Sequence, residues 1–134
     1  MLKKGRSFYQ LDYHLIFGTK NKIPSISRET LSLLKNSFDE IANEMDFKIY
    51  IMNGYLDHIH LLLTIPPKHA IADVVQKIKG RSSHALKIQW QEGYGIFAVE
   101  RLSFPRISSY IKDQEIHHKH GADFIEEIEK LQAS

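Results

Sequence analysis

The sequence predicts an α+β domain with a ferredoxin-like (RRM-like) fold, in which a split βαβ arrangement places helices on one face of an antiparallel sheet. Two observations predict this class. Segments of alternating apolar and polar residues, typical of strands, and segments with apolar residues three or four positions apart, typical of helices, follow one another in the order β-α-β-β-α-β. A C-terminal helix that carries a tyrosine follows the last strand. The length of 134 residues suits one domain, which we expect to span residues 1–134.

The first strand is predicted at residues 8–19 and the first helix at residues 27–45. One face of the strand is polar, with Gln10, Asp12 and His14. The other face is formed by Tyr9, Leu11, Tyr13, Leu15 and Phe17. Ser27 is the expected N-cap of the helix. The apolar residues of this helix recur at helical spacing: Leu31, Leu34, Phe38, Ile41 and Met45.

Residues 47–65 predict two further strands, with Asn53-Gly54 as the hairpin turn between them. The second of these strands directs an apolar face to the core, formed by Ile59, Leu61, Leu63 and Ile65. A second helix is predicted to begin near Ala70. Its inward positions are expected to be Ile71, Val74, Val75, Ile78, Ala85 and Leu86.

The fourth strand is predicted at residues 93–102, and Pro105 fits the first turn of a third helix at residues 104–119. In this topology the first and third strands are neighbours in the centre of the sheet. Their polar residues are therefore expected on the face that the first two helices leave open.

Composition limits the class of protein to which the chain can belong, but it says little about the reaction that the protein performs. Cysteine is absent, which excludes disulfides and thiolate metal sites. No apolar run reaches the ~18–20 residues of a membrane span, and the N-terminus has no apolar signal-peptide core, so we expect a cytoplasmic protein without a membrane partner. The formal net charge of +2 does not by itself indicate a polyanionic partner.

Two histidines on the third strand are the first candidate for chemistry. His58 and His60 are two positions apart, so both point to the same face of a strand and bring two imidazoles close enough for one divalent ion. The alternative is that both are half-exposed sheet residues without a ligand, because the pattern is short. Two imidazoles alone do not make a strong site, so a third ligand is needed.

The third helix offers this ligand. Tyr110 and Gln114 are four residues apart and share a helix face with Ile107 and Ile111, which directs them toward the protein. The alternative is a packed tyrosine and a hydrogen-bonded glutamine. An amide oxygen would favour Mg²⁺ or Mn²⁺, and a tyrosine one turn away could attack an activated phosphate.

Several segments together resemble the single-tyrosine HUH transposases of bacterial and archaeal insertion sequences, which are related to the transposases associated with repetitive extragenic palindromes. The similar segments are YHLIFGTKNK, NGYLDHIHLLLTIP, VVQKIKGRSSHAL, WQEGYGIFAVE and YIKDQEIHH. Each segment is short, but their order and spacing are specific and span most of the chain.

This resemblance implies a metal-dependent endonuclease and strand transferase for single-stranded DNA. His58, His60 and Gln114 would be the metal ligands, and Tyr110 would form a 5′-phosphotyrosine intermediate. It also implies that hairpins at the ends of the element are the DNA partner. The working unit would be a homodimer in which the tyrosine helix can complete the partner's site.

The candidates for DNA contacts are basic residues. One group lies on the second helix: Lys77, Lys79, Arg81 and Lys87. A second group lies at the N-terminus: Lys3, Lys4 and Arg6. Contacts with phosphates would make binding strongly dependent on salt. The alternative is a solvated helix face. A further cluster contains His117, His118 and His120. We interpret it as a basic helix end that contacts DNA, with a metal site as the minor alternative.

Two other functions fit parts of the pattern. A non-catalytic module that binds single-stranded nucleic acid on the same fold would explain the basic helix, although such sheets stack bases on aromatic residues. A phosphodiesterase that uses water as its nucleophile would explain the histidines. Cleavage of a hairpin oligonucleotide separates the first from a transposase, and a trapped covalent adduct separates the second.

Overall fold

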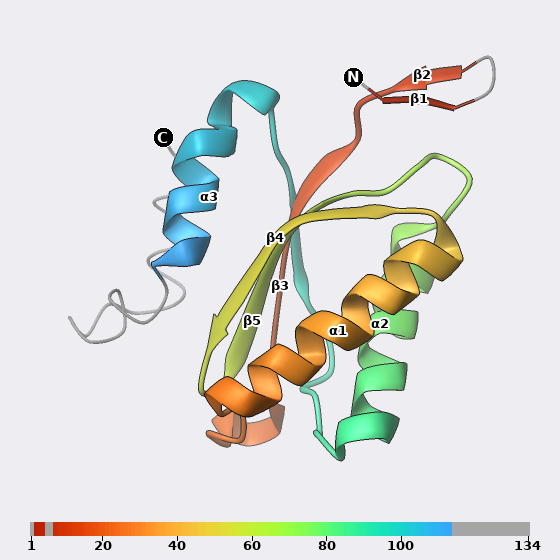
Figure 1. Cartoon of the computed structure of the whole chain (residues 1–134). Coiled ribbons are helices and arrows are strands. Elements are labelled where there is room, and N and C mark those ends of the chain that lie inside the picture. The colour runs from red at the N-terminus through yellow and green to blue at the C-terminus, as the bar shows by residue number, and fades with distance from the viewer. Residues whose placement is uncertain (1, 5–6, 114–134) are drawn as a thin grey trace.

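The computed structural model describes residues 2–4 and 7–113, and it contains a four-stranded antiparallel sheet with helices on both sides (Figure 1). The strand order is β4-β5-β3-β6. These strands are β3 (Asp12–Gly18), β4 (Lys48–Tyr55), β5 (His58–Thr64) and β6 (Gly95–Ala98). The predicted ferredoxin-like order is confirmed, and the first and third strands of that order, β3 and β5, are central neighbours.

Helices α1 (Arg28–Met45) and α2 (Ile71–Leu86) lie on one face of the sheet, and α3 (Phe104–Lys112) lies on the other (Figure 1). Two short 3-10 helices, η1 (Lys20–Lys22) and η2 (Arg101–Ser103), precede α1 and α3. Among the described residues, no helix combines the length and the apolar character needed to cross a membrane.

The predicted first strand is divided in the structure. Its beginning belongs to β2 (Ser7–Tyr9), which pairs with β1 (Leu2–Lys4) in a separate hairpin. Pairing with β5 starts at Asp12, opposite Thr64. Alternation alone does not detect this division, because both parts keep the period of two.

The main core lies between the sheet and helices α1 and α2. As predicted, the Ser27 side chain caps α1 by accepting a hydrogen bond from the Thr30 backbone at 3.1 Å. The apolar stripe of α1 is buried through Leu34, Phe38 and Ile41. These side chains meet the strand face that carries Leu15, Phe17, Ile59, Leu61 and Leu63.

One inward position of α2 was predicted wrongly. Ala85 is exposed, and Ser82 is completely buried in its place. The Ser82 hydroxyl donates to the Ile78 carbonyl oxygen at 2.7 Å and accepts from the Trp90 indole at 2.9 Å. Because both hydrogen-bonding capacities are used, a polar residue can occupy this apolar face at little cost.

The predicted hairpin turn at Asn53-Gly54 was also wrong. Both residues lie inside β4, opposite His60 and Ile59, and the turn falls at Leu56-Asp57. A Cβ atom at Gly54 would lie 2.5 Å from the His58 carbonyl oxygen, so glycine permits close approach of the two strands here. The Asn53 side chain donates to the Lys112 carbonyl oxygen at the end of α3, at 2.9 Å.

The second face of the sheet, expected to stay open, is partly covered by α3. Ile107, Tyr110 and Ile111 of this helix form a second buried cluster with Leu62 of β5. Pro105 lies in the first turn of α3, as predicted. The helix thus brings its tyrosine onto the strand face that carries the histidines.

Candidate active site

The two histidines predicted on one strand face lie on the central strand β5, on the face of the sheet that carries α3 (Figure 1). His58 pairs with Gly18 at the end of β3, and His60 pairs with Ile16. Their ring centroids are 5.1 Å apart. Their exposed fractions are only 4% and 0%, so they are not the half-exposed residues of the alternative interpretation. Burying two imidazoles side by side is costly unless partners satisfy them, and both have such partners.

The partner of His58 is the carboxylate of its sequence neighbour. His58 Nδ1 and Asp57 Oδ1 are 2.7 Å apart. Asp57 occupies the β4–β5 turn, and its carbonyl oxygen accepts a hydrogen bond from the Thr19 backbone at 2.8 Å. Asp57 was not predicted as a site residue, although its position directly before His58 was an available signal.

The partner of His60 is a third histidine from the neighbouring strand. His14 Nε2 lies 3.0 Å from His60 Nδ1, and the two rings stack with centroids 5.2 Å apart. His14 is completely buried, and this burial lowers its pKa to about 4, which keeps the ring neutral. The polar face of the first strand already contained His14, but only the β3–β5 register brings it to His60.

Tyr110 lies against this histidine group, as the predicted helix face required. Its ring meets His60 edge-on, with centroids 5.6 Å apart, and its centroid lies 6.4 Å from that of His14. Tyr110 is 9% exposed. A second tyrosine is close, since the Tyr55 ring of β4 lies 6.5 Å from the His58 ring. Among the described residues, the site therefore contains two phenols: Tyr110 beside His60 and Tyr55 near His58.

The predicted third ligand, Gln114, lies outside the described residues, directly after the described end of the α3 region at Asp113. Within the described ranges, no group of three histidine or carboxylate side chains could hold a metal ion. The donor set of His58 and His60 nevertheless suits a divalent ion, because a carboxylate–histidine pair such as Asp57–His58 is a common arrangement around metals. An additional donor would be needed to complete the site.

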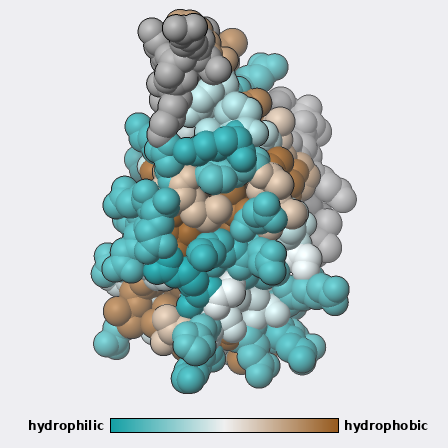
Figure 2. Space-filling model, turned by 90° about the vertical axis from the view of Figure 1, so that its right-hand side faces the viewer, coloured by the Kyte–Doolittle hydropathy of each residue, from teal (hydrophilic) through white to brown (hydrophobic). Residues whose placement is uncertain are grey.

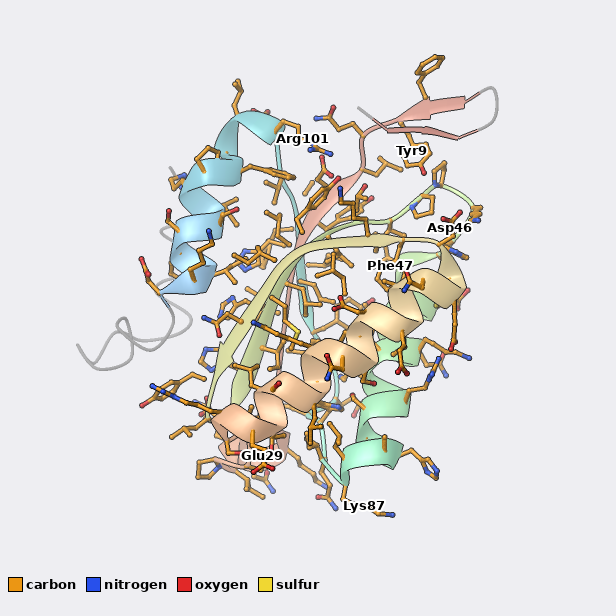
Figure 3. All side chains as sticks on the ribbon, in the orientation of Figure 1. Tyr9, Glu29, Asp46, Phe47, Lys87 and Arg101 are labelled. Atoms are coloured by element: carbon orange, nitrogen blue, oxygen red, sulfur yellow. The ribbon has the colours of Figure 1, made fainter. Side chains whose placement is uncertain are left out.

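Helix α3 is fixed to its own chain at both ends. At its start, Arg101 binds the Asp12 carboxylate through Nε at 3.0 Å and through Nη2 at 3.4 Å, and it also donates to the Tyr50 hydroxyl at 2.6 Å. Figure 3 shows Arg101 between this end of α3 and the strands. At the other end, Asn53 holds the carbonyl oxygen of Lys112. These contacts position Tyr110 over the histidines.

The basic residues of α2 lie on the opposite side of the sheet from this site. The helix-covered side has a mostly hydrophilic outer surface (Figure 2), and Lys87 lies at the far end of α2 (Figure 3). Lys79 donates to the carbonyl oxygens of Gln91 and Gly93, and Arg81 pairs with Glu44 of α1. Lys77 and Lys87 are exposed.

The N-terminal candidates are only partly described. Lys3 and Lys4 belong to β1, and Arg6 lies outside the described residues. The cluster of His117, His118 and His120 also lies outside them. A contribution of either group to DNA contacts therefore stays a prediction.

Comparison with known proteins places this chain in a family. The family described as "Transposase IS200 like" matches residues 7–114. The ISDra2 transposase TnpA of Deinococcus radiodurans is 32% identical over 127 residues, which cover 84% of this chain and 91% of that protein. The transposase for insertion sequence element IS200 of Salmonella typhimurium is 27% identical over 122 residues, covering 81% and 80%.

Solved structures agree with the fold. A Deinococcus radiodurans chain of 28% identity superposes with a TM-score of 0.66, covering 84% of this chain and 98% of that one. A REP-associated tyrosine transposase bound to a REP hairpin superposes with a TM-score of 0.67 at 18% identity, covering 90% and 75%. At that identity the second likeness concerns the fold.

Proposed function

The chain belongs to the IS200-like transposases, and on that basis we propose that it cleaves and rejoins single-stranded DNA at the ends of an insertion sequence, with Tyr110 as the nucleophile. One observation carries this proposal: the Tyr110 ring lies 5.6 Å from the ring of His60, over a face with two adjacent buried histidines. A phenol next to a candidate ion site is suited to attack on a phosphodiester.

The proposed ion is Mg²⁺ or Mn²⁺, held by His58, His60 and Gln114. When bound, such an ion supplies positive charge that stabilises the scissile phosphate as negative charge develops on it. The protein contributes a rigid and nearly dry setting, because both histidines are buried and Tyr110 is almost so. Limited access of water favours transfer to the tyrosine over simple hydrolysis.

In the proposed step, the Tyr110 hydroxyl oxygen attacks phosphorus in line with the bond to the 3′ oxygen. A bond between phosphorus and the tyrosine oxygen forms as the bond to the 3′ oxygen breaks. The phenolic proton is, in net terms, transferred to the 3′ oxygen, so the products are a 5′-phosphotyrosine and a 3′-hydroxyl. An incoming 3′-hydroxyl reverses the same exchange, which rejoins DNA without a further source of energy.

The proposed substrate is a single-stranded hairpin at the end of the element, and the expected setting is the cytoplasm. The structural relative bound to a REP hairpin supports a hairpin ligand. The basic residues of α2 and of the N-terminus all stay candidates for phosphate contacts, and Lys77 and Lys87 are the exposed ones in the α2 group. A non-catalytic binding module has less support, because α3 covers part of the sheet face on which bases would stack.

The test is cleavage of a labelled hairpin oligonucleotide with a single-stranded flank, in the presence of Mn²⁺. The wild-type protein should form a protein–DNA adduct that survives denaturing electrophoresis. Tyr110→Phe should form none while still binding the hairpin. Tyr55→Phe is the matched control, because it removes the other nearby phenol. An adduct with Tyr110→Phe, or its loss only with Tyr55→Phe, would contradict the proposal.

A homodimer is also proposed, and its sites can be shared or separate. In this structure Tyr110 lies beside the histidines of its own chain and α3 is fixed at both ends, which supports action within one chain. Mixing Tyr110→Phe with His58→Ala decides the matter. Activity restored in the mixture indicates sites completed by the partner, whereas no activity indicates complete sites in each chain.

A further inference from the structure

We propose that Asp57 and His14 are positioning residues that accept the Nδ1 protons of His58 and His60 and thereby direct the two Nε2 lone pairs toward a shared divalent ion. The inference rests on the proposed function, which makes the two histidines ligands. Neither Asp57 nor His14 has a role in the proposed cleavage step itself. Both acceptors lie outside β5: Asp57 in the turn before it, and His14 on β3.

The contact between Asp57 and His58 determines which nitrogen of the His58 ring carries the proton. An ionised carboxylate can only accept, so the contact of 2.7 Å requires the proton of His58 to lie on Nδ1. A neutral imidazole with its proton on Nδ1 has its lone pair on Nε2. The turn itself is held in place, because the Asp57 carbonyl oxygen accepts from the Thr19 backbone at 2.8 Å. The carboxylate therefore fixes both the tautomer and the orientation of His58.

The contact between His14 and His60 allows two arrangements, of which only one suits a ligand. If His14 donates, the proton of a neutral His60 lies on Nε2, and this nitrogen cannot bind a metal. If His60 donates from Nδ1, its lone pair lies on Nε2 and His14 is the acceptor. Binding of an ion through Nε2 therefore requires the second arrangement, with His14 neutral.

The surroundings of His14 indicate that this residue accepts a hydrogen bond for His60 and does not mainly stabilise the fold. The ring is completely buried, and its Nδ1 has no hydrogen-bond partner among the described residues. A buried polar atom without a partner costs stability. A histidine at this central position of the sheet is therefore better explained by the acceptor that His60 requires than by packing.

The experiment measures Mn²⁺ affinity by the electron paramagnetic resonance signal of unbound Mn²⁺, which does not depend on DNA cleavage. His14→Leu and Asp57→Ala remove the two acceptors, and each should weaken Mn²⁺ binding by about 10- to 100-fold, the usual effect of losing such a partner. His14→Gln keeps an acceptor oxygen and should restore most of the affinity. His84→Leu, on the exposed side of α2, is the matched control and should leave the affinity unchanged.

Two further measurements separate positioning from a structural role. His14→Leu removes a buried polar atom without a partner, but it also removes the acceptor of His60 Nδ1, and these two effects on stability oppose each other. The melting temperature should therefore stay close to that of the wild type while the Mn²⁺ affinity falls. In the wild type saturated with Mg²⁺, nitrogen-15 NMR should show His58 and His60 with their protons on Nδ1. A proton on Nε2 of either residue would overturn its part of the inference.

The outcomes distinguish this inference from the proposed function. If the wild type binds Mn²⁺ and all four acceptor and control variants bind it equally well, the positioning roles are wrong and the metal site stands. If His14→Leu loses all binding and His14→Gln does not recover it, His14 is a ligand and not a positioning residue. If the wild type binds no Mn²⁺, both the metal site of the proposed function and the inference fail.

Discussion

The contact between Arg101 and Asp12 gives a sharp prediction, because it joins the start of α3 to the central strand β3. The Asp12 side chain is 1% exposed and that of Arg101 is 35% exposed. Arg101→Gln removes the partner of a buried carboxylate and the stacking of the guanidinium on the Tyr50 and Phe104 rings, whose centroids lie 4.9 and 4.6 Å away. We expect a substantial loss of stability and a less firmly held helix α3.

The expected loss in the free energy of unfolding follows from the burial of the Asp12 and Arg101 side chains. Exposed ion pairs contribute about 0.2–1 kcal/mol, and breaking a buried pair from one side costs about 3–5 kcal/mol. Since one partner is buried and the other is partly exposed, we expect Arg101→Gln to lower the free energy of unfolding by about 2–3 kcal/mol. Urea unfolding followed by circular dichroism measures this difference.

Two comparisons make the result decisive. Lys68→Gln breaks the exposed pair with Asp46 and should cost less than about 0.5 kcal/mol. Asp12→Asn combined with Arg101→Gln should recover part of the loss, because no buried charge remains. A change below about 0.5 kcal/mol for Arg101→Gln alone would refute the reasoning, since the carboxylate would then not depend on its partner.

Three further predictions concern the core of the site. Burial lowers the pKa of His14 from 6.5 to about 4, so the unfolded chain takes up a proton at a higher pH than the folded chain does. The free energy of unfolding should therefore fall as the pH falls, by about 2 kcal/mol at pH 5 from this residue alone. His14→Gln should flatten the pH dependence of urea unfolding measured with a chelator. Gly54→Ala should cost about 2–3 kcal/mol, measured in the same way, because its Cβ would lie 2.5 Å from the His58 carbonyl oxygen. Ile111→Ala, at a fully buried position of α3, should cost about 3 kcal/mol and reduce adduct formation, whereas Leu102→Ala at an exposed position should cost less than about 0.5 kcal/mol.

Periodicity predicted most of the fold because each element has its own apolar face. The stripe of α1 and the alternation in β5 are local properties, and burial of each face requires the layers that the structure has. The two wrong predictions, of a turn at Asn53-Gly54 and of an inward position at Ala85, have local causes as well. Asn53-Gly54 has the composition of a turn, but Gly54 is required for close approach of the strands and Asn53 for a contact with α3. Ser82 is polar, yet its hydrogen bonds satisfy it in the core.

The sequence by itself determined the strand face of His58 and His60 and the helix face of Tyr110, because both follow from the fixed periods of strand and helix. Only the tertiary structure decided that α3 folds back over the sheet, which brings the tyrosine ring to 5.6 Å from His60. It also decided that His14 contacts His60, since this depends on the register of β3 against β5, and a shift by one residue would turn His14 into the core. Register and helix docking are set by contacts between residues far apart in the chain, and no local pattern encodes them.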